Sequence, residues 1–229
     1  MISLFKKKKT KYEEGWDSYS DSWNNSAKKK DMKFLGDEWG SEALSRVIVE
    51  VFVRPYIRPG SVVLEIGCGG GKYGALLAPL CRKIICSDVS SKMLERTKKR
   101  IGEKENIEFE KLNGYDLHQF KDNTIDFVFS FDVFVHIDIE DIYSYLQEIR
   151  RVLRSKGRGV LHFANLNSPD GWNKFVTEYS LNRGNNKHFD RFRFLTWEIV
   201  ERLLKIIGFN ILHYKKEPWR DILVVFEKP

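Results

Sequence analysis

Short apolar runs alternate with amphipathic segments along the central part of the chain. The runs are rich in β-branched residues and stop at glycine or polar residues, which is typical of buried strands. The segments between them repeat their apolar positions at helical spacing, as Leu76, Leu77 and Leu80 do. The predicted strands are residues 61–66, 83–87, 107–112, 126–130 and 159–164, and the predicted helices are residues 72–80, 90–101 and 138–153. This alternation requires crossover connections and therefore predicts a parallel sheet with helices on both faces.

The pattern changes toward the C-terminus. A helix over residues 196–207 ends at Gly208, and two strands follow at 209–214 and 221–226 with a short turn that contains Pro218. Because so short a connection allows only antiparallel pairing, the last strand must run against its neighbour. We therefore predict an α/β fold: a doubly wound, mostly parallel seven-stranded sheet with an antiparallel C-terminal strand.

Residues 1–40 precede this pattern and are predicted to form an extension with one short helix around residues 13–23. A second helix begins after Ser41, a residue type that caps helices well. A length of 229 residues suits one α/β domain with such an extension. We divide the chain into an N-terminal extension or lid (1–40) and one domain (41–229), in which residues 164–195 form a candidate recognition insertion.

The net charge of +7 is unevenly distributed. Residues 1–33 carry nine basic and five acidic side chains, whereas the rest of the chain is nearly balanced, with 30 basic and 27 acidic. The charge thus describes a basic N-terminus, and a nucleic-acid partner is not expected. We interpret the lysines at residues 6–9 as a solvated tail; weak peripheral contact of these N-terminal lysines with an anionic membrane is the alternative.

The chain contains three cysteines, Cys68, Cys81 and Cys86. An odd number without paired metal-ligand spacing indicates reduced thiols and no metal site. No stretch approaches the roughly 20 apolar residues that span a bilayer, so no transmembrane segment is predicted. Lysines follow the few apolar residues at the N-terminus, which is the reverse of a signal peptide. We therefore expect a cytoplasmic protein.

The first predicted strand runs into the glycine-rich turn Glu65-Ile66-Gly67-Cys68-Gly69-Gly70-Gly71. Ligands of open parallel sheets bind beyond the carboxyl ends of the strands, and glycines let the backbone approach a ligand closely. Asp88 ends the second strand, where a carboxylate can accept hydrogen bonds from ribose hydroxyls. The turn and Asp88 together predict a site for a nucleoside cofactor.

Two cofactor classes fit this turn. Gly69, Gly71 and Gly74 match the dinucleotide pattern G-x-G-x-x-G, a weak signal that leaves Glu65 and Gly67 unexplained. An acidic side chain beside the turn would repel a pyrophosphate, but it suits the positively charged amino group of a methionine moiety. Glu65 therefore favours a methionine-bearing nucleoside over a nicotinamide dinucleotide.

Five segments between residues 61 and 165 resemble, in order and spacing, the motifs of class I S-adenosylmethionine-dependent methyltransferases, type 11/12 of the small-molecule enzymes. They are residues 63–71, 88–94, 113–114, 127–137 and 157–164. The resemblance implies a Rossmann-like fold, S-adenosyl-L-methionine as the cofactor and methyl transfer as the reaction.

The resemblance also implies roles for individual residues. The cofactor-binding set that it implies is Glu65, Gly67, Cys68, Gly69, Gly71, Asp88, Val89, Met93, Asn113, Gly114 and Phe131. Glu65 and Gly67 would hold the methionine end and Asp88 the ribose, while Phe131 would line the methyl-transfer pocket. Asn113 stands where the family commonly has an aspartate, so it keeps a carbonyl acceptor for the adenine amine but lacks the charge.

Methyl transfer from a sulfonium needs positioning and exclusion of water more than covalent help, but a hydroxyl acceptor also needs a base. His136 follows the fourth strand, where several O-methyltransferases of this family place a histidine near the acceptor. A structural histidine at a helix start is an equal alternative. His162, within the fifth strand, is interpreted as a buried structural residue, and His188 is a second candidate base.

Acceptor recognition is expected outside the shared core. Trp39 lies in a segment, residues 34–40, that is predicted to close over the cofactor together with aromatic residues of the short N-terminal helix. Trp172 and His188 lie in the candidate insertion, whose arginines suit an anionic or sugar acceptor. Those aromatic residues are Tyr12, Trp16, Tyr19 and Trp23.

These observations favour methyl transfer to a small-molecule or glycan acceptor, at oxygen. An RNA or protein methyltransferase is one alternative, motivated by the basic N-terminus. Enzymes that methylate amino groups of nucleic acids usually carry an Asn/Asp-Pro-Pro-aromatic tetrad after the fourth strand, and residues 130–133 do not match it. A cofactor-binding module without catalysis is the other alternative.

Overall fold

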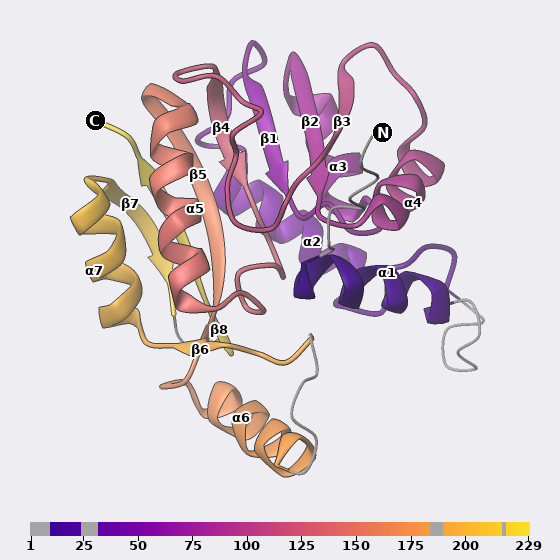
Figure 1. Ribbon diagram of the computed structural model, residues 1–229. Helices are drawn as coiled ribbons and strands as arrows, with labels where there is room; N and C mark the ends of the chain where they lie inside the picture. The colour runs from indigo at the N-terminus through magenta and orange to yellow at the C-terminus, as the bar shows by residue number, and fades with distance from the viewer. Residues whose placement is uncertain (1–9, 24–31, 184–189, 217–218) are drawn as a thin grey trace, which may run out of the picture.

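The computed structural model describes residues 10–23, 32–183, 190–216 and 219–229. Its centre is an eight-stranded sheet with the order β3-β2-β1-β4-β5-β8-β7, and β6 pairs with β5 outside this path (Figure 1). The strands are β1 (Val62–Ile66), β2 (Lys83–Asp88), β3 (Ile107–Lys111), β4 (Ile125–Phe129), β5 (Leu153–Asn165), β6 (Phe194–Leu195), β7 (Asn210–Lys215) and β8 (Asp221–Glu227). β8 is antiparallel to β5 and β7, and the other pairings are parallel. The predicted sheet is confirmed, and the two-residue β6 is an additional strand.

Helices cover both faces of this sheet. They are α1 (Lys11–Trp23), α2 (Glu42–Ile48) with its π-helical continuation η2 (Val49–Val53), α3 (Lys72–Leu77) with the 3₁₀ turn η3 (Ala78–Leu80), α4 (Ser91–Ile101), α5 (Ile139–Val152), α6 (Pro169–Asn182) and α7 (Trp197–Ile207). α5 and α7 pack on one face, and α2, α3 and α4 pack on the other (Figure 1). The predicted doubly wound arrangement is therefore confirmed.

The amphipathic patterns bury the residues that the spacing predicted. Ile142, Leu146 and Ile149 of α5 are fully buried against the sheet. Ser90 caps α4 through a hydrogen bond that its Oγ accepts from the N–H of Met93, at 3.1 Å. Packing and capping thus agree with the local pattern in this part of the chain.

β5 is longer than the sequence pattern predicts. It begins at Leu153, directly after α5, instead of at Gly159. The N–H of Lys156 donates to the carbonyl of Lys228, and the N–H of Lys228 donates to the carbonyl of Gly157. This pairing joins residues far apart in the sequence, so a local pattern cannot reveal it.

α1 packs across the carboxyl ends of the central strands (Figure 1). At one point the hydroxyl of Ser90, the N-cap residue of α4, donates to the carboxylate of Asp17 at 2.5 Å. At another, the hydroxyl of Tyr12 donates to Asp141 of α5 at 2.7 Å. α1 therefore bridges α4 and α5 above the edge of the sheet where ligands of such folds bind. The lysines at residues 6–9 lie outside the described residues.

Substitution of Gly70 by alanine is expected to destabilise the protein by about 2–3 kcal/mol. A Cβ at Gly70 would lie 1.8 Å from the carbonyl oxygen of Leu35, so the segment before α2 must move away from the glycine turn. Urea unfolding measures the effect. Gly60→Ala is the matched control, because a Cβ there meets nothing within 4 Å, and its stability should stay within about 1 kcal/mol. Equal effects of the two substitutions would contradict this packing.

Candidate active site

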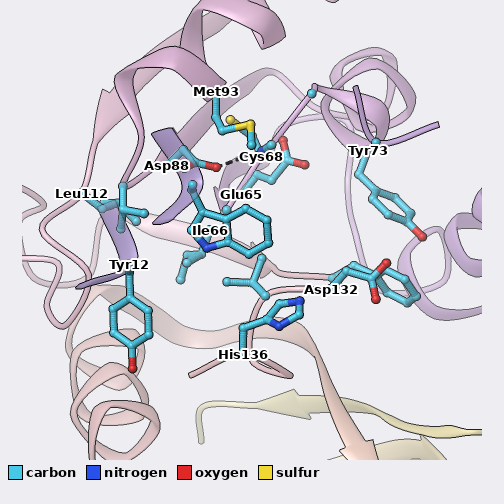
Figure 2. Close-up of a pocket in the computed structure, with 18 of the residues that line it drawn as sticks. Tyr12, Glu65, Ile66, Cys68, Tyr73, Asp88, Met93, Leu112, Asp132 and His136 are labelled. Atoms are coloured by element: carbon cyan, nitrogen blue, oxygen red, sulfur yellow. Dashed lines mark hydrogen bonds between the residues drawn. The ribbon is translucent and has the colours of Figure 1, made fainter. Parts of the chain in front are cut away.

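A cavity lies between the carboxyl ends of the central strands and α1, and Figure 2 shows side chains that line it. Its empty space, the open mouth included, is about 930 Å³, which is the size of a small-ligand site. We call it the first cavity. Nine of the eleven residues in the predicted cofactor set line it: Glu65, Gly67, Cys68, Gly69, Asp88, Val89, Met93, Gly114 and Phe131. The fold thus brings most of that set together at one place.

Asp88 fastens the glycine turn to the end of β2. Its Oδ2 accepts a hydrogen bond from the N–H of Gly69 at 2.9 Å (Figure 2). Its Oδ1 accepts one from the N–H of Ser90, also at 2.9 Å. Burial raises the pKa of Asp88 to about 6, although these N–H donors favour the charged form. A carboxylate offers about four acceptor positions, so Asp88 retains acceptor capacity for hydroxyls in the cavity.

Gly67 leaves room for no side chain. Its φ is +77°, a left-handed conformation, and a Cβ would lie 2.2 Å from Cγ2 of Val133. Val133 follows β4 and lines the same cavity. Glycine is therefore required here by both backbone conformation and contact.

Glu65 is a buried carboxylate with an unsatisfied oxygen. Its side chain is 2% exposed, and Oε2 has no hydrogen-bond partner among the described residues. Burial raises the pKa of Glu65 to about 7, and the charge of Asp88 adds to this rise. An ammonium group in the cavity would satisfy the free oxygen and offset the repulsion between the two carboxylates. The site therefore fits a cofactor with a positively charged amino group.

Two members of the predicted cofactor set do not line the cavity. Gly71 is the N-cap residue of α3 and packs against α4, where a Cβ would lie 3.1 Å from Cα of Thr97. The side-chain oxygen Oδ1 of Asn113 accepts hydrogen bonds from the N–H groups of Tyr115 and Asp116, both at 3.0 Å. In this arrangement Asn113 stabilises its own loop beside the cavity.

A second cavity adjoins the first and extends toward α6. Six residues line both: Trp16, Trp39, Tyr73, Phe131, Asp132 and His136. They therefore mark the junction of the two cavities, where a group held in one would face a molecule held in the other.

His136 sits at this junction between aromatic rings. Its ring makes edge contacts with Trp16 at 5.3 Å and with Phe192 at 5.1 Å between centroids. Burial lowers the pKa of His136 to about 4, although Asp132 and other nearby carboxylates oppose this shift. The imidazole is therefore neutral at pH 7 and can accept a proton.

The comparisons with known proteins agree with this geometry. Residues 64–161 match the model of a family described as a methyltransferase domain. The chain is 30% identical over 104 residues to the probable S-adenosylmethionine-dependent methyltransferase CRG1 of Saccharomyces cerevisiae. Residues 64–161 therefore correspond to a methyltransferase domain, and the yeast relative is named for the cofactor S-adenosylmethionine. The aligned region covers 44% of this chain and 35% of the length of the yeast protein.

Solved structures show the same fold. Magnesium protoporphyrin IX methyltransferase of Synechocystis, solved with bound SAH, superposes with a TM-score of 0.69 at 17% identity, covering 95% of this chain and 98% of that one. A putative methyltransferase of Haloferax volcanii, in complex with the activator Trm112, gives a TM-score of 0.68 at 15% identity, covering 92% and 97%. At such identities the likeness establishes the fold of the methyltransferase domain.

The candidate acceptor residues are dispersed. Trp39 lines both cavities, whereas Trp172 lies on the exposed side of α6 with 53% of its surface accessible. His188 lies outside the described residues. Within the described ranges, no helix has the length and apolar character needed to cross a bilayer, and no group of three or more His, Cys, Asp or Glu side chains could hold a metal ion.

The interactions of His162 were not predicted from the sequence. Its buried ring lies 3.3 Å from a carboxylate oxygen of Asp132 through Nδ1 and 3.2 Å from one of Asp221 through Nε2. It also stacks on Phe131, with 4.1 Å between centroids. Burial lowers the pKa of His162, but the two carboxylates outweigh it and raise the pKa to about 9. No sequence signal links these residues, because they meet only through the pairing of β5 with β8 and the loop after β4.

Replacement of Asp88 by alanine is expected to weaken S-adenosylmethionine binding by about 100-fold. The change removes the ribose acceptor and releases the N–H of Gly69 from the turn. Isothermal titration calorimetry measures the dissociation constant. The control is Asp126→Ala. Asp126 likewise accepts a hydrogen bond from a backbone N–H, that of Val62, but it lies at the amino end of the strands, away from the cavity. Normal affinity in Asp88→Ala, or equal losses in both variants, would contradict the assignment.

Cofactor affinity is expected to fall below about pH 7. Glu65, with a pKa near 7, is ionised above this pH and protonated below it. Because an ammonium group favours the ionised form, binding at lower pH must displace the proton, and the dissociation constant should rise about tenfold per pH unit. Calorimetry between about pH 5.5 and 8 measures this profile. Asp88, with a pKa of about 6, adds a second step.

The control for this pH profile is Glu65→Gln. It should bind the cofactor more weakly above about pH 7 and lose the first step of the profile, since the amide does not titrate. A variant with the same slope as the original protein would show that another group causes the pH dependence.

Proposed function

We propose that this protein transfers a methyl group from S-adenosylmethionine to a small-molecule or glycan acceptor, at a hydroxyl oxygen. The observation that carries the proposal is the second cavity, which meets the first at six shared residues. An aromatic junction of this kind suits a compact acceptor better than an extended polymer. The bound cofactor supplies an electrophilic methyl group on sulfur, and the protein supplies position and shelter from water.

The protein's own residues divide these tasks. Glu65 would hold the methionine end of the cofactor and Asp88 its ribose. The burial and hydrogen bonding of these carboxylates in the first cavity support this assignment. Trp16 and Trp39 exclude water from the junction, where their rings lie 6.1 Å apart in an edge arrangement. His136 would accept the proton of the acceptor hydroxyl, and so prepare the oxygen for the methyl group that the cofactor would supply.

The lining of the second cavity also bears on the class of acceptor. Seven aromatic rings line it, together with six carboxylate side chains. Aromatic faces and carboxylates are partners for sugar rings and polar small molecules, whereas a phosphate backbone would be repelled by the acidic groups. This composition supports the small-molecule or glycan proposal over the RNA alternative.

We further propose a cytoplasmic location. The three cysteines, Cys68, Cys81 and Cys86, are buried and form no disulfide. Reduced thiols agree with a reducing compartment. The acceptor is then expected among soluble metabolites or sugar conjugates of the cytosol.

His136→Asn is expected to lower the turnover number by about 10²–10⁴-fold and to leave cofactor affinity unchanged. Turnover is followed as S-adenosylhomocysteine released in the presence of a panel of hydroxyl-bearing metabolites and sugars. His213→Asn is the matched control, because His213 lies on β7, where its ring packs against Phe52 of η2. Full activity of His136→Asn would exclude it as the base, and absence of turnover with every hydroxyl compound would overturn oxygen methylation.

A further inference from the structure

The second cavity is acidic although the chain as a whole is basic. The described residues that line it include Glu38, Asp132, Asp170, Glu178, Asp190 and Asp221. Three described lining residues are lysine or arginine: Lys174, Arg191 and Arg220. The whole chain has a net charge of +7. The sign of the charge is therefore reversed locally, around the place where an acceptor would bind.

Two of these three basic side chains are already neutralised. Nζ of Lys174 lies 3.0 Å from the carboxylate of Glu178. Arg220 donates from Nε to both carboxylate oxygens of Asp221, at 2.9 and 2.7 Å. The same ion pairs neutralise Glu178 and Asp221, and His162, whose pKa is raised to about 9, is a further cation that pairs with Asp132. The remaining carboxylates, Glu38, Asp170 and Asp190, still outnumber Arg191, so an anionic acceptor would meet an excess of negative charge. This disfavours the anionic acceptor that the arginines of residues 164–195 suggested.

Asp132 is held at the junction of the two cavities. It has a left-handed backbone with φ of +57°, which is rare outside glycine, asparagine and aspartate. The carboxylate is fixed by Nδ1 of His162, and its side chain remains 29% exposed. When His162 is neutral, the N–H of Asp132 can instead donate to the same nitrogen, at 3.2 Å. In either protonation state His162 therefore contacts Asp132, and part of the carboxylate faces the cavities.

Aromatic rings surround the same junction. Tyr19 and Trp39 stack with their centroids 5.2 Å apart, and Trp16 meets both rings edge-on, at 5.8 and 6.1 Å. Aromatic faces beside carboxylates are the usual surroundings of a bound organic cation, because both attract positive charge while the rings exclude water. A neutral hydroxyl compound would use the rings but gain little from the excess of carboxylates.

We propose that the acceptor is a small organic cation, a molecule that carries an ammonium group beside the hydroxyl to be methylated, and that Asp132 is the carboxylate that holds this charge. The inference rests on the proposed function and narrows its substrate class. An amino alcohol or an amino sugar meets both requirements. Asp132 would also fix the distance between the ammonium group and the reacting oxygen, and so select among such acceptors.

The test uses three probes of nearly equal shape: choline, which is cationic, 3,3-dimethylbutan-1-ol, which is neutral, and 3,3-dimethylbutanoate, which is anionic. The full chain is loaded with S-adenosylhomocysteine to prevent turnover, and binding is measured by tryptophan fluorescence and calorimetry. Choline is expected to bind about tenfold more tightly than the neutral alcohol at low ionic strength, with the anion weakest. The preference should shrink as salt is added.

Asp132→Asn should reduce the preference for choline over the alcohol by about threefold or more. Asparagine tolerates the left-handed backbone, so the substitution removes charge with little strain. Asp190→Asn is a second variant, at an exposed position, in case Asp132→Asn lowers the melting temperature. It should reduce the preference for choline over the alcohol less than Asp132→Asn does. Glu201→Gln, on the outer side of α7 and paired with Lys205, is the control and should leave the preference unchanged.

Equal or tighter binding of the neutral alcohol or the anion would overturn the proposal. So would the absence of choline binding up to about 50 mM, or a preference that survives in both Asp132→Asn and Asp190→Asn. A failure of the proposed function is a separate result. It would appear as no methyl transfer to any hydroxyl compound, amino alcohols included, while the charge preference of the second cavity persists.

Discussion

Two carboxylates, Glu65 and Asp88, lie buried together where β1 and β2 end, and the rest of the site depends on this arrangement. Buried charges of equal sign are costly unless partners offset them. Asp88 is stabilised by two backbone N–H groups, one of them from the glycine turn. Glu65 keeps Oε2 without a hydrogen bond among the described residues, and a cation in the cavity would offset its charge. The amino group of S-adenosylmethionine is the cation that we propose for this place.

Helix α1, near the N-terminus, covers this edge of the sheet. α1 is tied to α4 through Asp17 and Ser90 and to α5 through Tyr12 and Asp141, so it spans the opening between two helices of the domain. Lys72 donates hydrogen bonds to the carbonyl groups of residues 39 and 40, at 2.9 and 3.0 Å, which fastens the following segment to α3. Aromatic side chains from both pieces reach the junction of the two cavities. Exclusion of water from the reacting centre thus depends on a part of the chain outside the shared core.

The two cavities differ in what they require from a ligand. The first surrounds one buried unsatisfied carboxylate oxygen and a tight glycine turn, which suits a single cofactor closely. The second cavity is broader, and aromatic rings and an excess of carboxylates line it. This lining constrains the charge of a ligand more strictly than its shape. His136 and Asp132 stand between them with different properties: one is a neutral imidazole among aromatic rings, and the other is a carboxylate fixed by His162. In the proposed reaction, the proton and the charge of an acceptor would therefore meet different groups.

The sequence by itself determined the alternation of strands and helices, the antiparallel last strand and most of the residues that line the first cavity, because these follow from local spacing and from a turn that is continuous in the chain. It also indicated Glu65 and Asp88, since each stands at the end of a buried strand. The tertiary structure alone decided the contacts that join distant segments. In the folded chain, Oδ1 of Asn113 accepts hydrogen bonds within its own loop. β5 is extended by pairing with Lys228, and His162 lies between Asp132 and Asp221. Such contacts depend on sheet register and loop path, which leave no mark in local periodicity.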